Sequence, residues 1–192
     1  MTQIILASAS PRRRELLTQI GIHYALHPVD MDETPLANEM PLPYVQRLAA
    51  EKSRLAQQQC AQQLPVLSAD TSVIINARIL GKPESEAACV EMLQQLSGRT
   101  HQVLTALSLR WGQQHWQTVS QTAVSFRPIA EEEMRCYWAT GEPCDKAGGY
   151  AIQGLGSVFV TQISGSFSGV VGLPLFETAS LLEQIGIKVI HD

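Results

Sequence analysis

Apolar and polar residues follow two periodicities along this chain, one expected of helices and one of strands. Between residues 42 and 58, apolar side chains recur at intervals of three and four positions, as at Val45, Leu48 and Ala49. This spacing places them on one face and predicts an amphipathic helix. Similar patterns predict further helices over residues 11–20, 84–96, 129–139 and 173–185.

Shorter apolar runs, bounded by turn-forming residues, predict strands. They span residues 3–7, 23–27, 64–75, 102–111, 116–127 and 158–163. Residues 68–71, three of which are polar, interrupt the third run, and Gly112 lies in a predicted hairpin turn between the fourth and fifth runs. Strand–helix units around a central hairpin indicate an α/β fold, in which helices flank a mixed, twisted sheet. Since no repeat or linker divides the sequence, we expect residues 1–192 to form one domain.

Composition narrows the classes of protein to which this chain can belong. Of its 192 residues, 45% are hydrophobic and 17% are charged, as in ordinary globular proteins. A net charge of −4 argues against binding to long nucleic acids, which requires a broad basic surface. No run approaches the roughly 20 apolar residues of a membrane span, and the N-terminus lacks the features of a secretory signal. Four cysteines without metal-site spacing are interpreted as free thiols, and we expect a soluble, cytoplasmic protein.

The segment after the first predicted strand contains several groups that favour phosphate binding. Ser8 precedes the predicted helix, and residues 12–14 in its first turn are all arginines. Cations at a helix N-terminus oppose the helix dipole and cost about 0.3–1 kcal/mol each. A bound anion reverses this effect, because N–H groups, hydroxyls and guanidinium groups then converge on it. Three solvated arginines on a surface helix are the alternative interpretation.

Two charged residues occur where the pattern is otherwise apolar. Lys52 falls within the apolar face of the helix predicted for residues 42–58, and Asp70 lies in the strand predicted for residues 64–75. A lysine at such a position either extends its amine to solvent, pairs with an acid or faces a polar cleft. A buried, unpaired carboxylate is unfavourable. Asp70 is therefore expected to bind a metal, to act as a base, or to form a structural salt bridge.

Loop segments add weaker candidates. Lys82 lies in a turn, and Lys146 and Gln153 flank glycines that allow a ligand to approach the backbone. Glu33 lies beside another acid in a loop, where the pair either helps to hold a divalent cation or is solvated. Cations, a metal and a carboxylate are the groups needed for water attack on a polyphosphate. No serine or cysteine nucleophile motif occurs in its usual context.

Several short motifs, in the same order along the chain, resemble those of the Maf family of nucleoside triphosphate pyrophosphatases. They lie at residues 6–13, 32–33, 48–52, 68–71, 81–83, 96–102, 145–148 and 171–174. The resemblance implies an α/β fold with two lobes around a deep cleft, as in Maf and ITPase-like proteins, and often a homodimer. It also implies hydrolysis of a nucleoside triphosphate to its monophosphate and pyrophosphate, with a divalent metal cation (Mg²⁺ or Mn²⁺) as cofactor.

The resemblance further implies roles for individual residues. Asp70 corresponds to the catalytic base, and Glu33 and Asp70 to metal-binding acids. The substrate-binding residues that it implies are Ser8, Arg12, Arg13, Lys52, Thr71, Lys82, Lys146 and Gln153. Among these, Arg12, Thr71 and Gln153 are implicated in a preference for dTTP and UTP. The amide of Gln153 both donates and accepts hydrogen bonds, as the imide edge of uracil or thymine requires.

Two other functions stay open on the sequence alone. One is a nucleotide-sensing regulator of cell division that binds triphosphates with little turnover. The other is a phosphatase or kinase that acts on a different phosphorylated substrate. The phosphate-containing product distinguishes these two functions from a pyrophosphatase, because only the pyrophosphatase releases pyrophosphate.

Overall fold

A computed structural model describes residues 2–61 and 63–190. Within these residues, seven strands form one mixed sheet. The strand order is β2-β1-β3-β5-β6-β7, and β4 pairs with β3 beside this path. β1 is parallel to β2 and β3, and the other pairs are antiparallel. The strands span β1 Ile4–Leu6, β2 Tyr24–Leu26, β3 Val66–Ile75, β4 Arg78–Leu80, β5 Thr100–Trp111, β6 Gln114–Phe126 and β7 Val160–Ser164.

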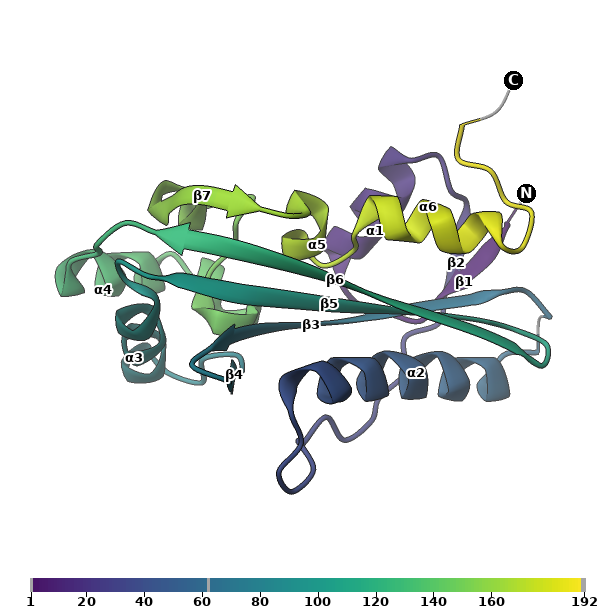
Figure 1. Ribbon diagram of the computed structural model, residues 1–192, viewed down its shortest axis with the longest axis horizontal. Helices are drawn as coiled ribbons and strands as arrows, with labels where there is room; N and C mark the ends of the chain where they lie inside the picture. The colour runs from purple at the N-terminus through teal and green to yellow at the C-terminus, as the bar shows by residue number, and fades with distance from the viewer. Residues whose placement is uncertain (1, 62, 191–192) are drawn as a thin grey trace.

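Helices cover both faces of the sheet and one of its ends (Figure 1). α2 lies along one face, α1, α5 and α6 lie on the opposite face, and α3 and α4 pack together at the end away from the two termini. The α-helices are α1 Pro11–Gln19, α2 Pro41–Gln59, α3 Glu86–Leu96, α4 Glu131–Ala139, α5 Phe167–Val171 and α6 Leu175–Glu183. The 3₁₀ helices η1 Glu142–Asp145, η2 Ala147–Gly149 and η3 Leu155–Phe159 follow α4. The predicted α/β class is confirmed.

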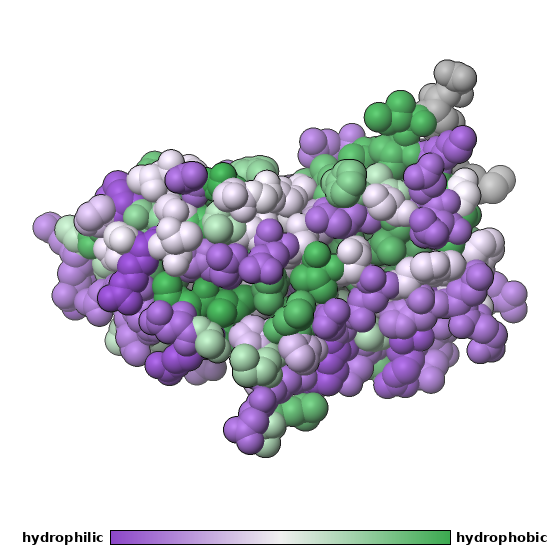
Figure 2. Space-filling model, viewed as in Figure 1, coloured by the Kyte–Doolittle hydropathy of each residue, from purple (hydrophilic) through white to green (hydrophobic). Residues whose placement is uncertain are grey.

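α2 shows how the apolar pattern determines packing. Val45, Leu48 and Ala49 are completely buried in one cluster with Ile74 of β3 and Leu104 of β5. Burial of each large aliphatic side chain stabilises the fold by about 1.5–3 kcal/mol. Hydrophilic residues cover the outer surface of the same helix (Figure 2). No helix within the described residues, α2 included, is long and apolar enough to cross a membrane.

β3 and β4 differ from the sequence prediction. β3 continues through residues 68–71 without the predicted interruption, because the carboxylate of Asp70 has a cationic partner and does not need to leave the strand. β4 forms within residues 76–83, where the sequence pattern predicts a turn and no strand. Asn76 and Ala77 both have positive φ, and they close a two-residue hairpin between the paired residues Ile75 and Arg78.

α5 is a further difference, since the sequence pattern predicts no element over its residues. The helix has only five residues, which is too short to show an apolar periodicity. It begins where the hydroxyl of Ser166 accepts a hydrogen bond from the N–H of Gly169 at 3.0 Å. Residues 141–156 are rich in glycine, which predicts an irregular segment, and they likewise contain short 3₁₀ turns.

The hydrophobic core is concentrated towards the two ends of the sheet. At one end, α1 and α6 pack on β3 and β5 through residues such as Leu17, Leu67 and Leu182. At the other end, α3 and α4 contribute Leu93 and Met134 to a second cluster. The polar middle of β3 lies between these two clusters. The arrangement agrees with two lobes on either side of a cleft.

Candidate active site

A gap in the strand pairing opens one edge of β3. On its other edge, β3 pairs with β5 along almost its whole length. On the open edge, β1 pairs with β3 only as far as Leu67, and β4 begins to pair only at Val73. Within the described chain, no strand covers residues 68–72 on this edge, and a cavity of about 380 Å³ lies beside it. Asp70 and Thr71 extend from opposite faces of β3, and both line this cavity.

Lys52 joins two carboxylates on the α2 side of the cavity. Its Nζ lies 2.6 Å from Oε1 of Glu33 and 2.8 Å from Oδ1 of Asp70. The side chains of Lys52 and Asp70 are almost completely buried, whereas that of Glu33 is half exposed. Partial burial raises the pKa of Glu33, but the hydrogen bond and the charge of Lys52 outweigh this effect and hold the pKa below its ordinary value. Lys52 therefore faces the cleft and pairs with acids, rather than extending to solvent.

The N-terminal end of α1 borders the cavity without a side-chain cap. Ser10 occupies the N-cap position, but its hydroxyl accepts no hydrogen bond from the first turn. Its backbone N–H instead donates to Oγ of Ser8 at 3.2 Å. Pro11 fixes the backbone of the first helical residue, and no acid occupies the first turn. The backbone N–H groups of Arg12 and Arg13 and the positive end of the helix dipole therefore face a site where an anion can bind.

Arg13 links three parts of the cavity wall. Its Nε donates to the carbonyl of Gly172 at 2.8 Å, Nη1 donates to Oγ of Ser8 at 3.1 Å, and Nη2 donates to Oγ1 of Thr71 at 3.3 Å. Burial lowers the pKa of Arg13, while the charge of Asp70 opposes that effect. Each terminal nitrogen keeps one further N–H. That Arg13 binds phosphate stays a prediction. Only these two remaining N–H groups could contact a phosphate oxygen.

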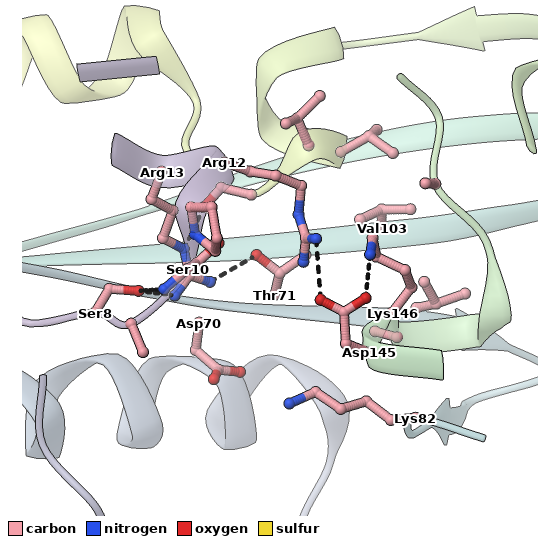
Figure 3. Close-up of a pocket in the computed structure, with 18 of the residues that line it drawn as sticks. Ser8, Ser10, Arg12, Arg13, Asp70, Thr71, Lys82, Val103, Asp145 and Lys146 are labelled. Atoms are coloured by element: carbon pink, nitrogen blue, oxygen red, sulfur yellow. Dashed lines mark hydrogen bonds and ion pairs between the residues drawn. The ribbon is translucent and has the colours of Figure 1, made fainter. Parts of the chain in front are cut away.

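Asp145 lies across the cavity from α1, between two of the predicted cations (Figure 3). Its Oδ2 is 3.3 Å from Nη1 of Arg12, and its Oδ1 accepts a hydrogen bond from Nζ of Lys146. Burial raises the pKa of Asp145, but the hydrogen bond and charge of Lys146 outweigh this effect and the pKa is lowered. Lys82 extends towards Asp70 from the loop after β4 (Figure 3). Asp145 belongs to the sequence motif at residues 145–148, but the sequence alone predicts no role for it.

Residues 150–153 form another wall of the cavity. Tyr150 is buried, and its hydroxyl lies 2.8 Å from Nε2 of His101, which is also buried. Both rings pack edge-to-face against Phe126. Gln153 is exposed at this wall. The aromatic cluster supports the wall from behind, and it is not evident in the sequence because its members are far apart along the chain.

All ten site residues predicted from the sequence line this one cavity. Five are cations, two are acids and three are uncharged polar residues. The cations surround a space bordered by the N-terminal end of α1, and Asp70 lies beside them. Such an arrangement can bind a polyanion and hold a carboxylate next to it, which is the chemistry of phosphoanhydride hydrolysis.

Comparisons with known proteins place these features in a family. The sequence profile described as "Maf-like protein" matches residues 3–185. A dTTP/UTP pyrophosphatase of Methylococcus capsulatus is 50% identical over 185 residues, which cover 96% of this chain and 92% of the relative. A dTTP/UTP pyrophosphatase of Pasteurella multocida is 50% identical over 196 residues, with 97% and 98% covered. A solved HAM1 protein of Coxiella burnetii has a TM-score of 0.49 and 19% identity over 66% of this chain and 73% of that chain. The profile and the two near full-length relatives show that this chain belongs to the Maf family.

Proposed function

We propose that this chain hydrolyses dTTP and UTP to the nucleoside monophosphate and pyrophosphate, with residues 1–192 acting as one catalytic domain. The main observation is the position of Asp70, which lies beside Lys52 at the open edge of β3, in a cavity with four further cations. A triphosphate is the small polyanion that such a cavity fits. Relatives that are 50% identical over almost their whole length are named dTTP/UTP pyrophosphatases, which supports this substrate.

The triphosphate binds at the N-terminal end of α1. Backbone N–H groups of the first turn and Arg12 contact its oxygens from one side, and Lys82 and Lys146 contact them from the other. Asp145 holds Arg12 and Lys146 before substrate arrives. Because phosphate oxygens accept the same hydrogen bonds as a carboxylate, the substrate takes over these two cations from Asp145. Arg13 keeps Ser8 and Thr71 in place around the bound phosphates.

Asp70 acts as the general base. It accepts a proton from a water molecule whose oxygen bonds to phosphorus as the bond to the oxygen bridging the α- and β-phosphates breaks. The electron pair of that bond leaves on the bridging oxygen, which departs with pyrophosphate if the water attacks the α-phosphorus and with the nucleoside monophosphate if it attacks the β-phosphorus. Lys52 donates a hydrogen bond to Oδ1 of Asp70 and so fixes the direction of the carboxylate. A positioned base of this kind contributes about 10²–10⁴-fold to the rate.

Glu33 and Asp70 are the residues that would hold a divalent cation. Both carboxylates lie within hydrogen-bonding distance of the single ammonium group of Lys52, so one cation can reach both. Within the described residues, no group of three or more His, Cys, Asp or Glu side chains is arranged to bind a metal. Two carboxylates with phosphate oxygens are a usual ligand set for Mg²⁺, and they fit a metal that arrives with the substrate. When bound, the metal neutralises phosphate oxygens and makes water more acidic.

The pyrimidine base of the nucleotide is recognised by residues 151–156, which we call the base-side loop. Gln153 is exposed on this loop and lines the cavity. Its amide can accept a hydrogen bond from the imide N–H of uracil or thymine and donate one to a neighbouring carbonyl. Adenine and cytosine lack that N–H donor between two carbonyls, so they form fewer of these bonds.

Substitution of Asp70 by Asn tests the proposed function. Wild-type protein with Mg²⁺ should release pyrophosphate from UTP and dTTP, and Asp70→Asn should reduce the rate by at least about 100-fold. The matched control is Asp30→Asn, which changes an exposed acid of the same loop region as Glu33. If Asp70→Asn still hydrolyses UTP at the wild-type rate, Asp70 is not the general base. Nucleotide binding without release of pyrophosphate would favour the sensor instead, and orthophosphate as product would favour a phosphatase.

A further inference from the structure

Two residues anchor the base-side loop at its ends: Tyr137, near the end of α4, and Glu142, which follows that helix. At its start, the backbone N–H of Ala151 donates to the hydroxyl of Tyr137 at 3.0 Å. At its end, the N–H groups of Leu155 and Gly156 donate to the two carboxylate oxygens of Glu142, each at 2.9 Å. The hydroxyl of Tyr137 itself donates to Oε1 of Glu142 at 2.7 Å. One carboxylate thus holds the whole loop, and we call Tyr137 and Glu142 the loop clasp.

Two glycines of the base-side loop allow this close approach. A Cβ atom on Gly154 would lie 2.2 Å from Oε2 of Glu142, and one on Gly156 would lie 2.7 Å from the hydroxyl of Tyr137. Both distances are far shorter than a van der Waals contact. Neither glycine has a positive φ. At Gly154 the requirement for glycine comes from Glu142, and at Gly156 it comes from both the hydroxyl of Tyr137 and the backbone oxygen of Ala151, which an added Cβ would meet at 2.8 Å.

Glu142 connects the loop to the phosphate side of the cavity as well. Its backbone carbonyl accepts a hydrogen bond from Nζ of Lys146 at 3.3 Å. Burial raises the pKa of Glu142, but the hydrogen bonds from Tyr137 and from the two loop N–H groups outweigh it, and the pKa is lowered. The carboxylate is therefore charged at neutral pH. Its hydrogen bonds are charge-assisted and about twice as strong as those between neutral groups.

We propose that Glu142 is a positioning residue for base selection, which holds the base-side loop so that the amide of Gln153 meets the imide edge of a pyrimidine. Glu142 is not among the described residues that line the cavity, so it acts through the loop and not on the nucleotide. Gln153 lies between the two anchored ends, at Ala151 and at Leu155, and any shift of the loop displaces its amide. The inference rests on the proposed function, in which Gln153 recognises the base.

Glu142→Gln tests this role with little change in volume. The amide NH₂ of glutamine takes the place of one carboxylate oxygen that accepts a hydrogen bond from a loop N–H. Two donors then face each other, and that hydrogen bond of the clasp is lost. The ratio of kcat/KM for UTP to that for ATP should fall about tenfold, a loss of about 1.4 kcal/mol of discrimination. Inhibition by inorganic tripolyphosphate, which has no base, should change by less than about twofold in Kd. Glu132→Gln, an exposed glutamate on α4, is the matched control and should keep the wild-type ratio.

A double variant separates positioning from a general loss of structure. In a Gln153→Ala background, Glu142→Gln should lower the UTP to ATP ratio no further, because the two residues act on the same contact. If Glu142→Gln does not fold, Tyr137→Phe removes only the hydroxyl of the clasp and provides the same comparison.

Three results would overturn the inference. The first is an unchanged UTP to ATP ratio in a folded clasp variant. The second is an equal loss of affinity for tripolyphosphate and UTP, which is the result of a purely structural role. The third is additive losses in the double variant. If wild-type protein releases no pyrophosphate from UTP, it is the proposed function that fails. The role of Glu142 is then tested by comparing the affinities for UTP and ATP in the same variants.

Discussion

His101 should make the stability of this fold depend on pH. Its side chain is 1% exposed and packs edge-to-face against Phe126 and Tyr150, with ring centroids 4.9 and 5.4 Å away. Nε2 shares a hydrogen bond with the hydroxyl of Tyr150, while Nδ1 is buried with no partner among the described residues. An imidazolium ion would place a second N–H and a full charge in this environment. Burial accordingly lowers the pKa of His101 to about 4, from an ordinary value of 6.5.

The size of the effect follows from these two pKa values. Between them, the unfolded chain binds a proton at His101 that the folded protein does not bind. Stability therefore rises with pH across this range and falls as the solution is acidified through it. The complete difference corresponds to about 3 kcal/mol. Between about pH 7.5 and about pH 5, His101 alone should remove about 2 kcal/mol from the free energy of unfolding.

Urea unfolding of His101→Gln measures this contribution. Glutamine does not titrate, and its amide can still bond to the hydroxyl of Tyr150. The variant is expected to lose about 2 kcal/mol less than the wild type over the same pH interval, whatever its stability at neutral pH. His23→Gln, which changes an exposed histidine, is the matched control and should follow the wild-type curve. Parallel pH dependence of His101→Gln and the wild type would refute the reasoning.

Lys52→Met should lower the free energy of unfolding by about 3–5 kcal/mol, because it leaves Asp70 buried without its cation, and adding Asp70→Asn should restore most of that loss. A double variant no more stable in urea than Lys52→Met would contradict this. Arg13→Lys should reduce stability by about 1–3 kcal/mol in thermal unfolding, since one ammonium group cannot reach three acceptors in three directions; an unchanged Tm would argue against the link. Gly154→Ala should unfold at lower urea concentration than Gly81→Ala, because the first added Cβ meets a carboxylate oxygen at 2.2 Å and the second meets open space. Equal midpoints for these two variants would count against the loop clasp.

The sequence predicts the fold well where one interaction dominates. The apolar face around Leu48 decides both the length and the orientation of α2, and the prediction differs from the structure by one residue at each end. It fails where a local rule is overridden by a distant partner. Aspartate is disfavoured in strands, which led to the predicted interruption at Asp70. The ammonium group of Lys52, 18 residues away, removes that penalty, and the strand continues.

The candidate site could be predicted only as a set of residue types. Phosphate chemistry requires cations and carboxylates, so residues such as Arg12 and Lys82 are conspicuous in the sequence. The residues that hold them in place are not conspicuous, because their role depends on contacts between distant segments. Asp145 meets Arg12 across 133 positions, and Glu142 resembles any exposed loop acid until its hydrogen bonds to the base-side loop are known.

The open edge of β3 also bears on self-association. An uncovered strand edge is a template to which another chain can add by backbone pairing, and many sheet proteins prevent this with short edges, shielding segments or inward-pointing charges. The edge at residues 68–72 has two of these protections: it is five residues long, and it displays the buried charge pair of Asp70 and Lys52. The charge pair of Asp70 and Lys52 thereby also disfavours the pairing of another strand with this edge.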